Sequence, residues 1–428
     1  MKVLVLGSGA REHALAWRLR QDPGVTAVVC APGNPGMTAL GRCVPVDIAN
    51  PAAMLSLAEQ EGVDLTVVGP EAALDAGAAD VFHAHGRPIV GPPKRAAQLE
   101  ASKAFAKQFM DRHGIPTARF VVCDDLPSAL SAVAGDRFGF PVVVKADGLA
   151  AGKGVVIAGT RADAEQAIRA AMEERQFGEA GRRLVIEECL TGPEVSFFAL
   201  ADGRRAIALG TAQDHKRIFD GDRGPNTGGM GAFAPSPLLD ARLSAQVMSD
   251  IVQKVIAAMA REESPYHGFL YVSLMLTPAG PRVIEFNVRF GDPEAQVVLP
   301  LLDGSFGSLL LAAAQGALTG SELAAPSRCA VGVVMASAGY PASADSGRVI
   351  DGLEAAAAQE GILVFHAGTR RQNGQLVTTG GRVLTVVGQG PTFERAMDRA
   401  YAAVRLIRFE GMQYRRDIGA KAIHVDAN

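Results

Sequence analysis

The sequence predicts a multidomain protein of mixed α/β and α+β class, with a parallel sheet in its N-terminal part. The chain has 428 residues, too many for one ordinary hydrophobic core. Strand and helix patterns alternate over the first hundred residues, strands joined by glycine turns dominate the middle, and a small mixed β/α region ends the chain.

The first hundred residues are expected to form a Rossmann-like sheet. Short apolar runs indicate strands at 3–6, 25–29, 65–68 and 88–90. Helix patterns occupy 10–19 and 52–61. Such alternation is typical of a parallel sheet that is covered on both faces and binds ligands at the carboxyl ends of its strands.

The middle of the chain follows a different pattern. A helix is predicted at 102–113, and residues 120–210 indicate mostly strands, with one helix around 162–175. Asp202-Gly203 between two apolar strands predicts a hairpin. Residues 221–231 carry five glycines and a proline, which favours a ligand loop, ordered or mobile, over a regular element.

The remaining elements complete the predicted order. A helix at 241–261 precedes a hairpin of 270–276 with 282–290, and a further helix lies near 310. Pro326 marks a boundary. Beyond it the patterns predict strands at 330–335, 362–365 and 382–387 and a helix at 392–407.

Composition excludes several classes of protein. Hydrophobic residues make up 48% and charged residues 20%, as in soluble globular proteins. A net charge of −3 gives no general attraction to nucleic acid or to an anionic membrane. No apolar run approaches the length of a transmembrane helix. Five dispersed cysteines without a Cys-x-x-Cys pair favour free thiols in the cytoplasm.

The segment 284–294 carries the strongest functional signal. Alternation along a strand places Glu285, Asn287 and Arg289 on one face. A carboxylate and an amide oxygen are ligands that Mg²⁺ accepts when phosphate oxygens complete its shell. The alternative is a half-buried strand with a solvated polar face. The opposite face of the strand is bulky and apolar, because it carries Phe286, Val288 and Phe290. This apolar face favours the metal site over the solvated strand.

Residues 148–154 resemble a Walker A loop without being one. The spacer is one residue short, Gly154 replaces the Ser or Thr that binds Mg²⁺, and a strand follows. The glycines can instead fold as a flap over phosphates. Lys145 at the end of an apolar strand, and Lys103 on the preceding helix, are candidates for phosphate contact.

Two other segments are candidate binding sites. The strand ending at Glu187-Glu188, followed by Glu194, offers backbone groups for adenine and carboxylates for ribose. Asp214 and Lys216 precede the glycine loop, which carries Asn226 and Thr227. These residues form either a solvated basic turn or a site for an anionic substrate.

The turn Gly7-Ser8-Gly9 argues against a nicotinamide enzyme. The dinucleotide fingerprint needs a glycine where Glu12 stands and an acid where Cys30 stands. The turn can still present backbone amides to a phosphate, with Arg11 nearby.

In order, these motifs resemble the ATP-grasp superfamily and, within it, the phosphoribosylamine–glycine ligase family. The resemblance covers nearly the whole chain and is carried by residues 7–14, 32–34, 69–71, 99–105, 145–155, 212–217, 224–231 and 289–294. The last two motifs are highly specific to that family. Departures are mild: Ala10 replaces a usual glycine, Pro35 interrupts a small-residue turn, and Val272-Ser273 replace an Ala-Gly pair.

The resemblance implies a fold and a reaction. It implies an N-terminal domain at 1–101, an ATP-grasp domain at 102–326 with a flap subdomain at about 121–192, and a C-terminal domain at 327–428. A monomeric, ATP-dependent ligase of purine biosynthesis would join glycine to phosphoribosylamine through an acyl phosphate. Another ATP-grasp carboxylate–amine ligase is the nearer alternative. A NAD-linked oxidoreductase and a nucleotide sensor are more distant ones.

The resemblance also implies roles for the candidate residues. Mg²⁺ or Mn²⁺ would be held by Glu285 and Asn287. ATP would be bound by Lys103, Lys145, Gly152, Lys153, Gly154, Glu187, Glu188 and Glu194. The other substrates would contact Gly9, Arg11, Glu71, Asp214, Lys216, Asn226, Thr227 and Arg289. Catalysis would fall to Arg289, Asp214 and Lys216.

Overall fold

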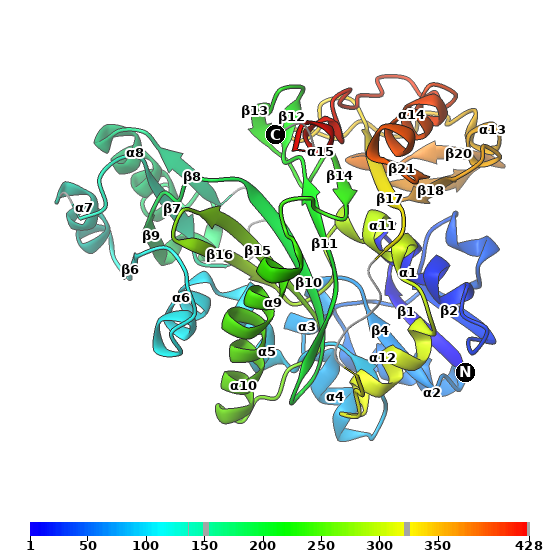
Figure 1. The fold of residues 1–428 in the computed structure, drawn as a ribbon, viewed down its shortest axis with the longest axis horizontal. Coiled ribbons are helices and arrows are strands. Elements are labelled where there is room, and N and C mark those ends of the chain that lie inside the picture. Colours follow the sequence, from blue (N-terminus) through cyan, green and yellow to red (C-terminus); the bar gives the residue numbers. More distant parts are fainter. Residues whose placement is uncertain (136, 149–153, 321–325, 426–428) are drawn as a thin grey trace.

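The N-terminal part of the chain forms the predicted parallel sheet. The computed structural model describes residues 1–135, 137–148, 154–320 and 326–425 (Figure 1). Five parallel strands lie in the order β3-β2-β1-β4-β5. Their bounds are Lys2–Gly7 for β1, Ala27–Pro32 for β2, Arg42–Cys43 for β3, Leu65–Val68 for β4 and Ile89–Val90 for β5.

Alternate residues of β1 pack on opposite faces of this sheet. Val3 and Val5 share a core with helix α1 (Ala10–Arg20). Leu4 and Leu6 belong to a second core with α2 (Pro51–Glu61) and α4 (Ala78–Ala84). The predicted cover of helices on both faces is therefore confirmed. Two further helices follow, α3 at Glu71–Asp75 and α5 at Lys94–Ala101.

A four-stranded antiparallel sheet lies apart from the main body, at the left of Figure 1. Its strands are β6 (Phe120–Cys123), β9 (Leu184–Glu188), β7 (Val142–Ala146) and β8 (Val155–Ala158). Helix α6 (Lys103–Arg112) leads into this sheet. A separate apolar core packs α7 (Leu126–Ala134) and α8 (Arg161–Met172) against it.

The prediction of a single helix in this region was wrong, because α7 was not foreseen. Its start carries two recognisable signals. Asp125 accepts a hydrogen bond from the Ser128 amide at 2.8 Å, and Pro127 lies in the first turn.

The largest sheet joins the middle of the chain to its C-terminal part. Eight strands lie in the order β16-β15-β10-β11-β14-β17-β21-β18, each antiparallel to its neighbours. Their bounds are Glu194–Asp202 for β10, Ala206–Asp214 for β11, Gly231–Ala234 for β14, His267–Thr277 for β15, Gly280–Asn287 for β16, Cys329–Ala336 for β17, Ile362–His366 for β18 and Arg382–Gly390 for β21. This sheet crosses the proposed boundary at 326/327 without a break.

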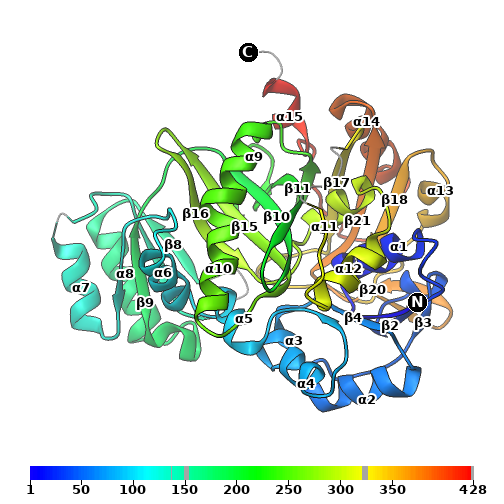
Figure 2. The same ribbon diagram turned by 60° about the horizontal axis from the view of Figure 1, so that its bottom comes forward.

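Helices pack on this sheet and around the C-terminal strands. α9 (Ala241–Val247) and α10 (Gln253–Arg261) share a core with β10 and β15, and a short π-helix joins them (Figure 2). The other helices are α11 at Glu294–Val298, α12 at Phe306–Ala314, α13 at Leu353–Ala357, α14 at Phe393–Val404 and α15 at Ala420–Val425.

Three strand predictions need correction or confirmation. The hairpin at Asp202-Gly203 is confirmed, since the Asp202 carboxylate accepts hydrogen bonds from the amides of Arg204 and Arg205. Strand β16 ends at Asn287, not at residue 290, because the chain leaves the sheet before Arg289. Residues 221–231 are not wholly irregular: β13 (Arg223–Asn226) pairs with β12 (Arg217–Phe219).

A second hairpin was not predicted. Strands β19 (Thr369–Gln372) and β20 (Gln375–Thr378) form a short two-stranded ladder, and Val377 of β20 also bridges Val349. Their sequence has little apolar alternation, so it gave no strand signal.

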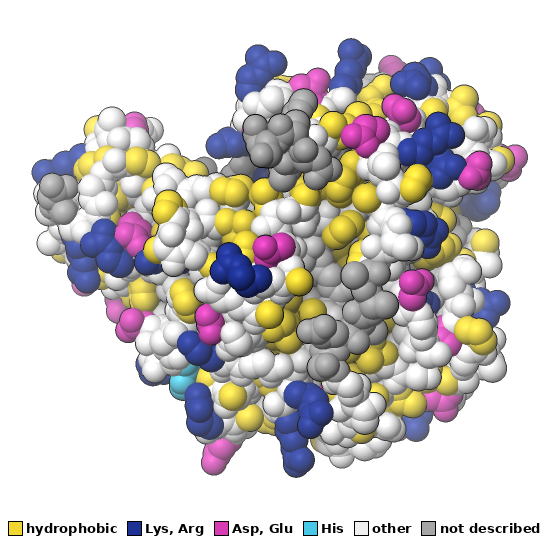
Figure 3. All heavy atoms as spheres, viewed as in Figure 1, with side chains coloured by type: hydrophobic (Ala, Val, Ile, Leu, Met, Phe, Trp, Pro, Cys, Tyr) yellow, Lys and Arg dark blue, Asp and Glu magenta, His cyan; other side chains and the backbone are white. Residues whose placement is uncertain are grey.

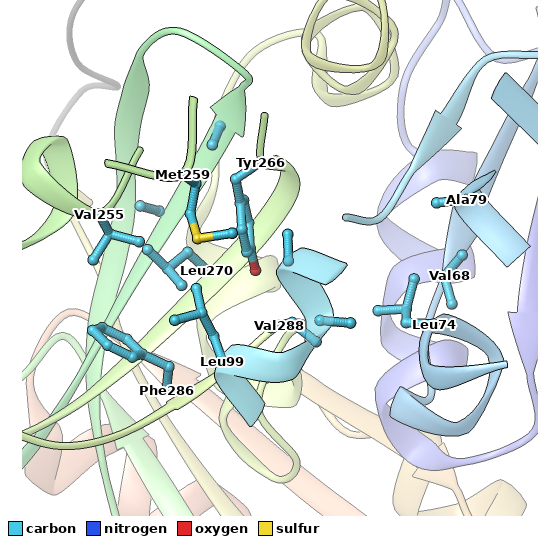
Figure 4. Packing of buried hydrophobic residues seen from close by; sticks show 14 of the residues in the cluster. Val68, Leu74, Ala79, Leu99, Val255, Met259, Tyr266, Leu270, Phe286 and Val288 are labelled. Carbon is cyan, nitrogen blue, oxygen red and sulfur yellow. The ribbon is translucent and has the colours of Figure 1, made fainter. Parts of the chain in front are cut away.

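The core continues from the N-terminal sheet into the large sheet. Figure 4 shows Leu99 of α5 among Met259 of α10, Leu270 of β15 and Phe286 of β16, all buried. Lys and Arg side chains are scattered among Asp and Glu on the face in Figure 3, as the small net charge suggests. Within the described ranges, no single helix is long and apolar enough to cross a bilayer, and the bent pair 294–301 and 306–314 meets at 112°.

Candidate active site

A cavity of about 690 Å³ lies where the N-terminal sheet, the four-stranded sheet and the large sheet meet. Most of the described candidate residues line it: Arg11, Glu71, Lys103, Lys145, Gly154, Glu187, Glu188, Glu194, Asp214, Lys216, Asn226, Thr227, Glu285, Asn287 and Arg289. Gly152 and Lys153 lie outside the described residues. The cavity has two charged regions, which differ in their cations.

The lysine end of the cavity comprises Lys103, Lys107, Lys145 and Glu187. The Glu187 carboxylate forms ion pairs with both Lys107 and Lys145, and all three side chains are at least 95% buried. Burial lowers the pKa of Lys107 to about 8. The two lysines outweigh burial and hold the pKa of Glu187 below its usual range. A buried region of net positive charge results.

The start of α6 places Lys103 beside this region. Ser102 caps the helix and donates a hydrogen bond to Asp147 at 2.9 Å, and the Ala104 amide donates to the same carboxylate at 3.0 Å. Lys103 Nζ donates to the Gly148 carbonyl at 3.0 Å. Burial lowers the pKa of Lys103, while nearby Glu285 opposes that shift. Lys103 therefore lies between the glycine segment and the candidate metal strand.

The end of β9 supplies another wall. The Glu188 carboxylate accepts hydrogen bonds from the Arg119 amide at 2.9 Å and the Arg119 Nε at 2.7 Å. Arg282 also contacts it, at 3.5 Å. Cys189 and Leu190 follow the strand and line the cavity with their neighbours.

Strand β16 brings Glu285 and Asn287 to the same wall. Their register partners on β15, Ser273 and Tyr271, also line the cavity. The apolar residues between and after them, Phe286 and Val288, are each 2% exposed and lie in the core. The alternation predicted for this strand is therefore confirmed as far as Asn287.

The arginine end of the cavity comprises Arg11, Arg289 and Arg382 with the carboxylates Glu71, Glu100 and Asp292. Arg289 donates to Glu71 at 3.0 Å, to Glu100 at 2.7 Å and to the Asn287 amide oxygen at 3.1 Å. Burial opposes its charge, but Glu100 and Glu71 raise the pKa of Arg289 above its ordinary value. Arg289 thus remains beside Asn287 although the strand has ended.

Contacts from both ends of the chain complete the arginine end. Arg11 donates to Glu12 at 2.6 Å and lies 3.9 Å from Glu71. The Gly9 amide also donates to Glu12, at 2.6 Å, and Gly9 does not line the cavity. Arg382 donates to the Asp292 carbonyl at 2.7 Å and lies 3.1 Å from its carboxylate. The role of Gly9 stays a prediction.

The end of β11 and the segment that follows it also line the cavity. Lys216 Nζ contacts Glu194 at 2.6 Å and Asp214 at 3.0 Å. Thr227 donates through its hydroxyl to the Lys216 carbonyl at 2.8 Å. The glycine-rich segment is therefore fixed to the Asp214–Lys216 pair.

Several cavity residues were given no role from the sequence, although Glu100, Asp292 and Glu294 fall within the motifs at 99–105 and 289–294. These residues are Glu100, Lys107, Tyr271, Asp292, Glu294 and Arg382. Lys107 stands four residues after Lys103, which puts both on one helix face and was a usable signal. Arg382 gave no local signal, because only the tertiary fold brings it to the cavity.

The chain matches three family descriptions in order. Residues 1–100 match "Phosphoribosylglycinamide synthetase, N domain", residues 101–295 the "ATP-grasp (A) domain" and residues 330–421 the "C domain". The chain is 49% identical to phosphoribosylamine–glycine ligase of Ralstonia nicotianae, covering 99% of this chain and all of that protein. It is 48% identical to the Xanthomonas axonopodis pv. citri ligase, covering 99% of this chain and 98% of the other.

Solved structures agree. The crystal structure of phosphoribosylamine–glycine ligase from Thermotoga maritima aligns with a TM-score of 0.84 and 35% identity, covering 97% of this chain and all of that one. A biotin carboxylase domain from Hydrogenobacter thermophilus shares the fold alone, with a TM-score of 0.73 and 19% identity over 96% of this chain and 91% of that one.

The fold and its charged cavity define an ATP-dependent ligase of the ATP-grasp class. Within that class the chain belongs to the phosphoribosylamine–glycine ligase family, and it has phosphoribosylamine–glycine ligase activity in purine biosynthesis. The recognition, the fold class and the function expected from the sequence are confirmed. A NAD-linked oxidoreductase is not supported.

Proposed function

We propose that the cavity ligates glycine to phosphoribosylamine in two steps, with ATP bound at the lysine end and the acceptor at the arginine end. The glycine carboxylate first attacks the γ-phosphate of ATP and becomes an acyl phosphate. The amine of phosphoribosylamine then displaces phosphate and forms the amide. Phosphorylation comes first because a carboxylate oxygen is a poor leaving group. The observation that carries this proposal is the pair Glu285 and Asn287 on one cavity wall beside Lys103.

The donor set on β16 fits a divalent ion that is shared with a nucleotide. Mg²⁺ usually takes one or two protein oxygens and completes its octahedron with water and phosphate oxygens. Among the residues the structure describes, no cluster of three or more His, Cys, Asp or Glu side chains offers a complete protein cage. Glu285 and Asn287 would hold Mg²⁺ or Mn²⁺, which would neutralise phosphate charge. Mg²⁺ is the proposed metal, since both donors are hard oxygens.

The lysines supply the remaining charge for phosphoryl transfer. Such transfer depends mainly on alignment and on stabilisation of charge. Lys145 and Lys103 would contact ATP phosphates, and the segment Gly152, Lys153 and Gly154 would close over them. The backbone after β9 would contact adenine. Glu194, together with Glu187 and Glu188, stays a candidate for the ribose side.

The arginine end would bind the acceptor and stabilise acyl transfer. Arg289 would stabilise the negative charge that develops in acyl transfer. Asp214 and Lys216 would orient glycine and the amine. Gly9, Arg11, Glu71, Asn226 and Thr227 would contact phosphoribosylamine. Enclosure would protect the acyl phosphate from water. A monomer in the cytoplasm, as expected from the sequence, completes the proposal.

The assignment is tested with a Glu285→Gln variant and by omission of substrates. Wild-type ADP release should require both glycine and phosphoribosylamine. Glu285→Gln should lose about 1000-fold in ligation, as expected when an electrostatic group of the transition state is removed. Its melting temperature should change little. Parallel loss of folding and activity would assign Glu285 a structural role only.

A further inference from the structure

The acidic side chains of the cavity differ in whether a cation neutralises them. Seven form ion pairs with Lys or Arg: Glu71, Glu100, Glu187, Glu188, Glu194, Asp214 and Asp292. Within the described part of the chain, Glu285 and Glu294 line the cavity without such a pair. Glu285 is accounted for by the proposed metal. Glu294 is not used by any step described so far.

Glu294 is held in place by neutral groups. It is the first residue of α11 and is 3% exposed. Ser196 Oγ donates to Glu294 Oε1 at 3.3 Å, and Tyr271 OH lies 3.0 Å from Ser196 Oγ. These contacts fix Oε1 of Glu294 without neutralising the carboxylate charge. Ser196 makes no hydrogen bond to the other oxygen, Oε2.

Gly291 makes room for the second oxygen. A Cβ at position 291 would come within 2.5 Å of Glu294 Oε2. Gly291 has no unusual backbone conformation that would explain a glycine there. The absence of a side chain at 291 therefore allows the Glu294 carboxylate to take this position at the cavity wall.

The second chemical step needs a proton acceptor. When the amine nitrogen attacks the acyl phosphate, a C–N bond forms, the C–O bond to phosphate breaks, and its electron pair leaves with phosphate. The nitrogen then carries an extra proton, which must be removed to give a neutral amide. A positioned carboxylate without a cation is suited to accept it.

We propose that Glu294 is the general base of acyl transfer and accepts the proton of the attacking amine on its carboxylate. This role rests on the proposed acyl phosphate route. Arg289, which lies at the same wall, would stabilise negative charge, whereas Glu294 would remove the proton.

The electrostatic surroundings support this assignment. Burial, followed by the neighbouring Asp214, raises the pKa of Glu294 to about 7. The charged or titratable groups that face it are Asp214 and Lys216 from the end of β11, Tyr271 from β15, and Arg289. A base near neutral pH matches the operating range of a cytoplasmic enzyme. Since the charged form is the acceptor, ligation should fall as the pH drops below about 7.

The test separates the two chemical steps in the full-length enzyme. Glu294→Gln keeps the shape of the side chain and removes the base. Ligation is measured with phosphoribosylamine, and acyl phosphate formation is measured as glycyl hydroxamate with hydroxylamine in its place. Hydroxylamine attacks acyl phosphates readily without a protein base. The ratio of ligation to hydroxamate formation should drop about 100-fold or more, in the range of general-base contributions. The acid limb of ligation should also disappear.

A charge-matched control is Asp303→Asn, an exposed carboxylate just beyond α11 that does not line this cavity. Its ratio should equal that of the wild type. Equal loss of both reactions in Glu294→Gln, or a raised KM for glycine, would overturn the role as base. Wild-type enzyme that makes no hydroxamate would instead contradict the acyl phosphate route itself.

Discussion

The lysine end and the arginine end of the cavity differ in how the chain builds them. Lys103, Lys107, Lys145 and Glu187 all come from residues 103–187, on α6 and on the adjacent strands β7 and β9. The arginine end combines Arg11 of helix α1, Arg289 after β16 and Arg382 of β21. The first is a local, buried network, whereas the second joins distant parts of the chain. Loss of a charge at the lysine end should therefore lower the stability of the fold. Loss of a charge at the arginine end should instead disturb how the distant parts of the chain are held together at the cavity.

The largest stability effect is expected from Glu187→Gln. This change leaves the buried ammonium groups of Lys107 and Lys145 without their carboxylate, and breaking a buried pair in this way costs about 3–5 kcal/mol. The free energy of unfolding from urea titration measures it. The matched change at the arginine end is Glu71→Gln, whose side chain is 38% exposed, and it should cost less than about 1 kcal/mol. If both variants lowered the free energy of unfolding equally, the proposed difference in stability between the lysine end and the arginine end would be wrong.

The next effect concerns catalysis at the arginine end. Arg289→Lys keeps a positive charge but cannot donate to Glu71, Glu100 and Asn287 together. Ligation should fall by about 100-fold, as for loss of a donor that stabilises the transition state. ATP-dependent hydroxamate formation should fall less, because phosphoryl transfer also uses the lysine end. A larger loss in the hydroxamate assay than in ligation would place Arg289 at the first step.

These contrasts explain how much could be predicted from the sequence. The lysine end and β16 are local, so strand alternation and the glycine motif indicated Lys145, Glu285 and Asn287. The fold class followed from the same periodicity. The arginine end depends on contacts between residues far apart in the sequence, such as Arg382 with Asp292, 90 positions apart, and Arg289 with Glu71, 218 positions apart. No spacing rule reports such pairs. The end of β16 was misplaced because Phe290 continues the apolar alternation after the strand has left the sheet.

A third prediction concerns acid stability beside the arginine end. His13 Nδ1 on α1 accepts a hydrogen bond from the His366 amide at 2.9 Å, which joins the N-terminal sheet to β18. Burial lowers the pKa of His13 to about 3 and that of His366 to about 4, from 6.5. Both are neutral in the folded protein at pH 7. Below pH 6.5 the unfolded chain binds protons first, so stability falls as the pH drops toward the folded values.

The expected slope is about 1.4 kcal/mol per pH unit for each histidine. Urea titrations at pH 7.5, 6.5 and 5.5, values chosen to bracket the ordinary pKa, measure it. His366→Gln keeps the backbone donor and should reduce the acid slope. If the dependence of the unfolding free energy on pH were unchanged in His366→Gln, other groups, such as buried His215, would cause the loss of stability in acid.

The smallest effect on activity is expected from Arg415→Met, which tests whether the C-terminal part also positions the glycine-rich segment. Arg415 is 1% exposed and donates to the Arg217 carbonyl at 3.1 Å and to Asp222 at 2.8 Å. Asp417, which Arg415 also binds, accepts from the Gly221 amide at 2.9 Å. These contacts fix the turn of the β12–β13 hairpin at Gly221 and Asp222. They also hold Arg217, which pairs with the cavity residue Asn226.

Because Asp222 and Asp417 are partly exposed, water can compensate for most of the lost ion pair, and the change should cost only about 1–2 kcal/mol. KM for phosphoribosylamine should rise about tenfold, with KM for ATP nearly unchanged, as expected for lost binding rather than lost chemistry. Arg408→Met is a suitable control, since Arg408 is exposed and its guanidinium donates to the Ile407 carbonyl at 2.8 Å rather than to the hairpin. If KM for ATP rose equally, the hairpin would serve the lysine end as well, and the two ends would not be independent.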